Sequence, residues 1–177
     1  AFMSLLSIGF LSEAIKEKSI AEPNQVFDYV RKRLIESITN EDQRDGFDGI
    51  LLRFEKTSHT ITYVAANNHP IIVSNNEIRH LAYDKMPVGK GVKSDKFTLH
   101  TIQSSKEDTI YLYTDGYADQ FGGEKGKKFK YKPLNDMLLL NNRRALNEQK
   151  EILDTTFNNW QGSLEQVDDV LIVGIKV

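Results

Sequence analysis

The sequence predicts an α+β protein in which helices form layers on mostly antiparallel strands. The order of segments along the 177 residues is the first observation: two helices, six or seven strands, two helices and one strand. The second is the short connection between strands, clearest at Asn75-Asn76, which is typical of a β-hairpin. The third is a strongly apolar last strand, which we expect inside the sheet and not at an exposed edge.

Two helices are expected before the strands. Residues 1–18 are apolar nearly all round in their first turns, which predicts a buried helix packed on a sheet. Residues 23–39 start with Pro23, a residue suited to a first helical turn, and carry apolar side chains along one face.

The period of the apolar residues then changes to two, which indicates strands. Residues 40–46 are expected to form a loop, and the strands follow at 50–55, 60–65, 70–74, 78–82, 97–103 and 109–114.

A stretch rich in Gly and Lys at 121–129 predicts a mobile surface loop. Helices are expected over 131–140 and 146–160, and the last strand over 168–177. We find no internal repeat or linker, so 1–177 is interpreted as a single domain.

The composition excludes several classes of function. The net charge of −2 gives no support to nucleic-acid binding, and no apolar run is long enough to insert into a membrane. The chain has no cysteine, which excludes thiolate chemistry and Cys–zinc sites and is compatible with a cytoplasmic location. Because the chain starts with Ala1 inside a helical pattern, we interpret it as part of a longer polypeptide.

Two acidic positions stand at the ends of apolar strands. Asp115 follows the strand 109–114 within a Thr-Asp-Gly turn, where Gly116 permits a close approach, and Asp168 opens the last strand. If these strands are antiparallel neighbours, both carboxylates meet at one end of the sheet, where they could bind a hard divalent cation. Strand alternation would place Asp169 on the other side from Asp168.

Segments 108–116 and 168–173 resemble the last two motifs of the metal-dependent serine/threonine protein phosphatases (PPM, or type 2C). They are most similar to the bacterial branch typified by the sporulation stage II protein E phosphatase and the regulators of stress sigma factors. Segments 45–49 and 65–70 fall where that branch has similar sequences. The resemblance covers essentially the whole chain.

This resemblance implies an α-β-β-α sandwich with two Mn²⁺ or Mg²⁺ ions that activate water for attack on a phosphate monoester. It assigns Asp115 and Asp168 as catalytic metal ligands. Gly116, Asp119 and Asp169 would support the site. The branch usually has Glu where this chain has Asp119, for which a helix-start cap is the favoured alternative.

The sequence departs from the family at its start. In the family, strands ending in an Asp and a Gly-His-Gly turn precede the first helix, whereas this chain begins just after that turn. We therefore expect about three-quarters of the family domain, an incomplete metal site and weak activity. The uncovered core surface would favour a homodimer.

The resulting hypothesis is a phosphoserine/phosphothreonine phosphatase domain of a bacterial signalling protein, behind upstream sensor domains that could be tethered to a membrane. An anti-anti-sigma-type phosphoprotein is one candidate substrate. The alternative is a non-catalytic regulatory or interaction module with the same fold, and a nuclease is less favoured because of the charge. His69, Asp48 and the lysines of 121–129 are interpreted as a loop histidine, a turn residue and solvated charges.

Overall fold

Helices and strands fall into two groups in the computed structural model, which describes residues 2–37, 46–55, 57–93 and 95–177. One compact unit comprises Ala1–Pro70 with Leu81–Ser104, and the other Ile71–His80 with Ser105–Val177. Each unit has its own apolar core. The interpretation of 1–177 as a single domain stays a prediction.

The helices of the first unit are α1 (Phe2–Ser12), which continues into the π-helical turn η1 (Glu13–Glu17), and α2 (Pro23–Ser37). The expected apolar face of α2 is buried, with Phe27, Val30 and Leu34 in the core. The predicted end of this helix at Thr39 lies outside the described residues.

The expectation of a buried first helix is confirmed for one side of α1 and wrong for the other. On α1 the side chains of Phe2, Leu5 and Ile8 are 68%, 71% and 65% exposed, while Met3 and Leu6 pack against the core. A helix that packs on the core along one side leaves its other side facing outward, whatever side chains stand there.

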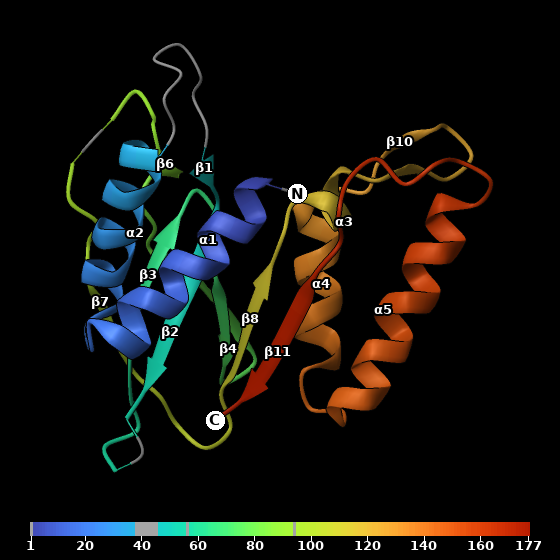
Figure 1. Ribbon diagram of the computed structural model, residues 1–177. Helices are drawn as coiled ribbons and strands as arrows, with labels where there is room; N and C mark the ends of the chain where they lie inside the picture. The colour runs from blue at the N-terminus through green and yellow to red at the C-terminus, as the bar shows by residue number, and fades with distance from the viewer. Residues whose placement is uncertain (1, 38–45, 56, 94) are drawn as a thin grey trace. The chain divides into compact units, whose positions relative to one another are not determined.

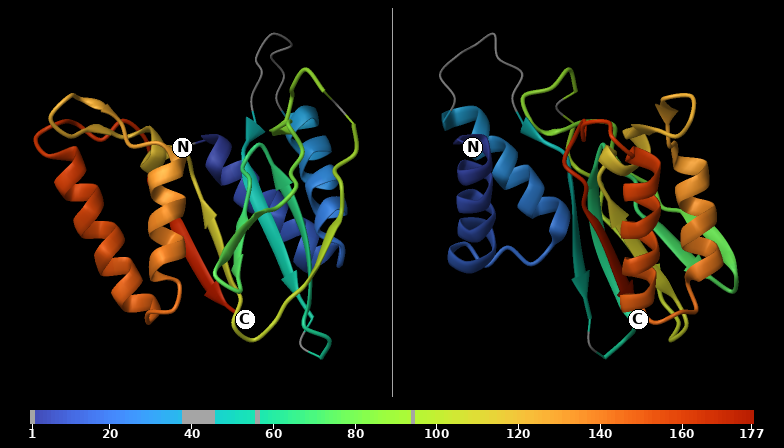
Figure 2. Two further views of the ribbon diagram at one scale, coloured as in Figure 1. Left: turned by 180° about the vertical axis from the view of Figure 1, so that it is seen from behind. Right: turned by 90° about the vertical axis from the view of Figure 1, so that its right-hand side faces the viewer.

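The main sheet of the first unit has the order β2-β3-β7 with antiparallel pairs, and α1 and α2 lie on one of its faces (Figures 1 and 2). Its strands are β2 (Gly49–Phe54), β3 (Thr60–Ala66) and β7 (His100–Gln103), and a short ladder joins β1 (Gly46–Phe47) to β6 (Val88–Gly89).

The strand expected from residue 97 begins only at His100. Carboxylates bind the backbone donors ahead of it: Phe97 N–H donates to Asp28 at 3.1 Å and Thr98 N–H to Asp84 at 2.9 Å. Side chains therefore satisfy these groups where a strand neighbour would otherwise do so.

The second unit contains an antiparallel sheet of order β11-β8-β4-β5. Its strands are β4 (Ile71–Ser74), β5 (Glu77–His80), β8 (Thr109–Tyr113) and β11 (Ile172–Lys176). The predicted hairpin at Asn75-Asn76 is confirmed, since both residues have the positive φ, 51° and 63°, of a tight hairpin turn.

Two expectations about the last strand are wrong. Strand β11 occupies an edge of its sheet, because within the described residues only β8 pairs with it, and its Val173 is 38% exposed. It also begins at Ile172 and not at Asp168. The N–H of Leu171, just before the strand, donates to the side-chain hydroxyl of Thr114 instead of to a backbone carbonyl of β8.

Helices α4 (Tyr131–Asn141) and α5 (Leu146–Gln161) cover one face of this sheet, as Figures 1 and 2 show. Leu134, Leu138 and Phe157 from these helices share a core with Ile71 and Tyr111 from the strands. Among the described residues, every helix is too short or too polar to serve as a membrane span.

The stretch predicted as a mobile loop contains a short ladder between β9 (Phe121–Gly122) and β10 (Lys127–Lys128). It is anchored to the end of α5, because Gly123 N–H donates to the Trp160 carbonyl at 2.8 Å. A side chain at Gly122 would overlap that carbonyl, which explains the need for glycine there.

Candidate functional site

Asp115 stands at the junction between β8 and the single-turn helix α3 (Gly116–Asp119). It occupies the N-cap position, but its side chain makes no capping hydrogen bond. Because the side chain is also exposed, its carboxylate oxygens remain available to a ligand.

The segment around Asp168 lies beside this junction because β8 and β11 are antiparallel neighbours, which is the arrangement on which the predicted convergence depends. Thr114 makes the connection beyond the ladder. Its hydroxyl donates to the Asp169 carbonyl at 2.8 Å and accepts from Leu171 N–H at 3.1 Å. Its backbone N–H donates to the Leu171 carbonyl at 3.0 Å.

The Thr114 hydroxyl thus takes the place of a backbone carbonyl as the acceptor for Leu171 N–H. The β8–β11 ladder therefore ends before Asp169. Asp168 and Asp169 belong to the irregular segment leading into β11, so strand alternation does not decide which side chain faces the site. The expectation of opposite sides therefore loses its basis.

Gly116 lets the two segments approach each other closely. A Cβ atom at this position would lie 2.5 Å from the Asp169 carbonyl oxygen and 3.3 Å from the Asp168 carbonyl oxygen. Only glycine fits here without a backbone shift. The group that approaches Gly116 closely is therefore the backbone of Asp168 and Asp169.

Local hydrogen bonds hold Asp168. One of its carboxylate oxygens accepts the N–H of Asp169 at 2.7 Å, and its backbone carbonyl accepts from the Gln166 side chain at 2.8 Å. The residue is exposed, and its other carboxylate oxygen has no hydrogen bond to the described residues. Asp168 can therefore act as a ligand while its orientation is fixed.

Asp119 lies at the C-terminal end of α3, so the helix-start cap favoured for it is wrong. Its N–H donates to the Asp115 carbonyl at 2.9 Å, and its carboxylate forms an ion pair with Lys128 at 2.9 Å. Asp119 thus connects α3 to β10.

Gln120 supports the same end of the unit and was not predicted. It is fully buried, and its side-chain amide donates to the Glu165 carbonyl at 2.9 Å and accepts from Val167 N–H at 3.3 Å. Its backbone carbonyl accepts from the Trp160 indole at 3.0 Å. Gln120 therefore fixes the segment that leads to Asp168, a role that no local sequence signal indicates.

Two candidates belong to the first unit. Asp48 accepts a hydrogen bond from the Asn67 side chain at 2.8 Å, and the His69 ring lies 5.6 Å from that of Tyr83. These contacts agree with the interpretation of both as loop residues. Asp45, in the first of the resembling segments, lies outside the described residues.

The donor set suits a hard divalent cation in part. Asp115 and Asp168 offer carboxylate oxygens at one end of a rigid sheet, and Mg²⁺ commonly takes one or two carboxylates and completes its shell with water. In the described ranges no three His, Cys, Asp or Glu side chains come together. Two carboxylates are fewer acidic ligands than a two-metal site requires.

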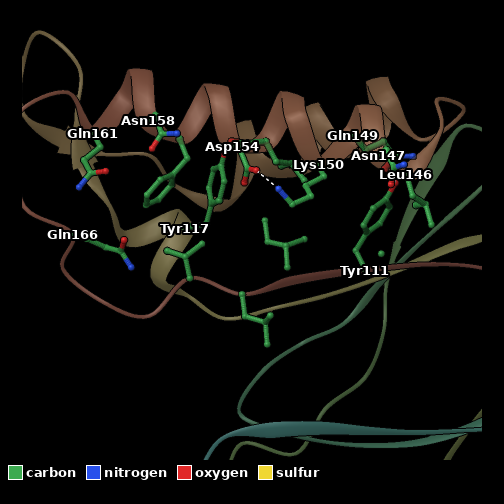
Figure 3. A pocket seen from close by; sticks show the side chains of 16 residues that line it. Tyr111, Tyr117, Leu146, Asn147, Gln149, Lys150, Asp154, Asn158, Gln161 and Gln166 are labelled. Atoms are coloured by element: carbon green, nitrogen blue, oxygen red, sulfur yellow. Dashed lines mark hydrogen bonds and ion pairs between the residues drawn. The ribbon is translucent and has the colours of Figure 1, made fainter.

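A cavity of about 580 Å³ lies in the second unit between α5 and the β8–β11 side of the sheet (Figure 3). Tyr111 donates to Gln149 at 2.6 Å and Tyr117 to the Leu153 carbonyl at 2.9 Å. Burial raises the pKa of Tyr111 to about 12 and also raises that of Tyr117. The one acid lining this cavity, Asp154, is paired with Lys150, so the cavity does not suit a metal.

Comparison with known proteins supplies a family and a fold. The family described as Stage II sporulation protein E (SpoIIE) matches residues 1–177. The SiaA-PP2C domain of Pseudomonas aeruginosa matches with a TM-score of 0.89 at 23% identity, over 100% of this chain and 70% of that chain.

Two further solved structures share the fold. The RsbU and RsbW domains of Rv1364c from Mycobacterium tuberculosis match with a TM-score of 0.72 at 16% identity, over 95% of this chain and 45% of that one. RsbX in complex with magnesium matches with a TM-score of 0.67 at 13% identity, over 98% of this chain and 74% of that chain. Comparison with curated proteins finds no match. The predicted α+β class is confirmed by these PP2C-type folds.

Proposed function

The chain belongs to the stage II sporulation protein E (SpoIIE) family, and from this premise we propose that it acts as the phosphatase domain of a signalling protein. The proposed reaction is the hydrolysis of phosphoserine or phosphothreonine in a protein substrate. The observation that carries the proposal is the antiparallel pairing of β8 with β11, which brings Asp115 and the Asp168 segment to one end of the sheet.

Asp115 and Asp168 would hold Mn²⁺ or Mg²⁺. When bound, such an ion supplies an activated water and polarises the phosphoryl oxygens. Thr114 and Gly116 act as positioning residues, because they fix the distance between the Asp115 turn and the Asp169 carbonyl. Gln120 acts through the segment 165–167, and Asp119 through its ion pair with Lys128.

The proposed partner is a phosphoprotein of a sigma-factor regulatory system, with an anti-anti-sigma-type protein as the first candidate. Two relatives support this: one combines RsbU with RsbW domains, and another comes from a study of the bacterial stressosome. The RsbX complex with magnesium supports the choice of a divalent ion.

A non-catalytic interaction module is the second candidate. In the part of the chain that the structure describes, no three metal-ligating side chains come together. Two-metal hydrolysis needs more ligands than one pair of acids supplies, and this favours the module. Such a module would bind the phosphoprotein without hydrolysing it.

The test measures Mn²⁺ binding by calorimetry and hydrolysis of an aryl phosphate and a phosphoserine peptide. We expect Asp115→Asn and Asp168→Asn each to weaken Mn²⁺ binding by about tenfold or more, since each removes one charged ligand. Any hydrolysis should fall with it. Glu124→Gln, an equally conservative change on the exposed β9–β10 turn, is the matched control and should change neither quantity.

The outcomes separate the candidates. Mn²⁺-dependent hydrolysis that both Asp variants reduce supports the phosphatase. Mn²⁺ binding or peptide binding without hydrolysis supports the module, and Mn²⁺ affinity unchanged in both variants contradicts the proposed site.

A further inference from the structure

A polar pocket of about 540 Å³ lies at the end of the second unit's sheet that is opposite to Asp115. The strand register places the β4–β5 turn, the start of β8 and the end of β11 together there. Figure 1 shows the α4–α5 turn at the same end. The pocket is lined by Asn75, Asn76, Lys106, Glu107, Asn142, Arg143 and Lys176.

Cations outnumber acids in this pocket. Lys106, Arg143 and Lys176 face a single carboxylate, Glu107, so the lining carries a formal charge of +2 in a chain whose net charge is −2. Within the described residues neither Lys106 nor Arg143 forms an ion pair or a side-chain hydrogen bond. Three cations around one hollow repel one another, and an anion would relieve this repulsion.

One of the cations is held in place. The Lys176 amine donates to the Arg144 carbonyl at 2.8 Å, which ties the end of β11 to the α4–α5 turn beside Arg143. The buried Asn142 adds an amide to the lining, and Gln149 fixes its backbone carbonyl with a hydrogen bond of 3.1 Å. Part of the lining is therefore ordered before any ligand arrives.

An adjoining recess continues the pocket toward α4. It shares Asn76, Asn142 and Arg143 with the polar pocket and adds Asp136, Leu139 and Leu140. Leu140 is 82% exposed, and Asp136 is already paired with Lys132 at 3.0 Å. The negative charge of Asp136 disfavours an anion in the recess, whereas the two leucines favour an apolar group.

We propose that the pocket binds a small phosphomonoester whose phosphate lies among Lys106, Arg143 and Lys176 and whose apolar part lies against Leu139 and Leu140. A phosphate monoester carries a charge near −2 at neutral pH, which matches the lining, and arginine binds phosphate with two parallel hydrogen bonds. A nucleoside monophosphate belongs to this class.

This pocket is distinct from the proposed metal site. The five residues of β8 separate them by roughly 17 Å, so a phosphate bound here would not be the one hydrolysed near Asp115. Binding of a phosphomonoester in this pocket therefore does not require the proposed phosphatase activity.

The test follows the amide resonances of the intact chain during titration with AMP at low salt, with adenosine and inorganic phosphate titrated separately. We expect saturable shifts with AMP in the millimolar range at Asn76, Lys106, Asn142 and Arg143. Phosphate should bind more weakly than AMP, and adenosine should bind more weakly still. The double variant Lys106→Ala/Arg143→Ala should raise the dissociation constant for AMP by about tenfold or more.

The matched control is Lys125→Ala/Lys127→Ala, which removes two exposed lysines from the β9–β10 hairpin. It should bind AMP like the unaltered chain. An equal loss of affinity in this control would reduce the effect to net charge and overturn the proposal. Absence of saturable shifts, or equal affinity for phosphate and AMP, would overturn it as well.

Discussion

At the scale of single residues, the site depends on small groups next to the acids. The Thr114 hydroxyl bonds both the Asp169 carbonyl and Leu171 N–H, so it holds the segment that the β8–β11 ladder no longer reaches. Gly116 leaves room for the same carbonyl. The position of Asp168 relative to Asp115 is thus decided by neighbours that carry no charge.

Gly116→Ala tests this arrangement. The new Cβ would lie 2.5 Å from the Asp169 carbonyl oxygen, which is backbone and cannot move aside alone. We expect a loss of about 1–3 kcal/mol in the free energy of unfolding, because overpacking outweighs the gain of up to about 1 kcal/mol from replacing glycine in a helix. Urea denaturation measures the stability, and calorimetry should show weaker Mn²⁺ binding.

Gly9→Ala is the control, because a Cβ at Gly9 in α1 meets no atom within 4 Å. It should leave stability unchanged or raise it slightly. Full stability and unchanged Mn²⁺ affinity in Gly116→Ala would show that the segment carrying Asp169 is free to move.

At the scale of elements, buried polar groups join α5 to the sheet. Gln149 accepts from Tyr111 at 2.6 Å and donates to the Asn142 and Arg144 carbonyls, each at 3.1 Å. One side chain thus connects β8, the end of α4 and the first turns of α5. The amphipathic pattern predicts that Gln149 lies on the inner face of its helix, but the partners follow from tertiary packing.

Two buried tyrosines of β8, Tyr111 and Tyr113, predict a pH dependence of stability. Burial raises the pKa of Tyr111 and Tyr113 from 10.0 to about 12, so the folded chain keeps these protons where the unfolded chain loses them. Their contribution is fully present below pH 10 and is lost as the pH rises toward 12.

Between pH 10 and 12 the free energy of unfolding should fall by about 1–3 kcal/mol less in Tyr111→Phe than in the unaltered chain. At neutral pH the variant should be less stable by about 1 kcal/mol in the free energy of unfolding, because it lacks the hydrogen bond to Gln149. Denaturation curves at neutral and alkaline pH measure both effects. An unaltered alkaline slope would contradict the assignment of a raised pKa to Tyr111.

At the scale of the whole chain, the elements could be predicted because their signals are local. The period-two residues of β3 and β8 and the Asn75-Asn76 turn specify strands and a hairpin within a few residues. The pairing of Asp115 with the Asp168 segment could also be anticipated, since apolar strands ending in acids imply a shared sheet end.

What could not be predicted depends on long-range register. The contacts of Gln120 with Glu165 and Val167 join residues about 45 positions apart and have no sequence pattern of their own. The edge position of β11 likewise depends on which strands are its neighbours, and an apolar sequence cannot distinguish a central strand from an edge strand.

Among the described residues β11 pairs with β8 alone, and this edge position predicts self-association. The ladder to β8 uses the backbone groups of Leu171 and Val177, so by antiparallel alternation those of Ile172, Gly174 and Lys176 point outward. No charged side chain lies between Asp169 and Lys176, and a net charge of −2 provides little repulsion between chains. We therefore expect the homodimer that the sequence suggested, with its mass rising with protein concentration.

Val173→Lys should weaken this association, since it places a charge on an edge strand at a side chain that is already 38% exposed. Sedimentation equilibrium measures the change, and we expect the dissociation constant to rise by about tenfold or more. Val92→Lys introduces the same charge at a side chain that is 84% exposed in the first unit, so it controls for net charge. If both variants weaken association equally, general repulsion explains the result. If Val173→Lys alone weakens it, the edge of β11 is the contact between chains.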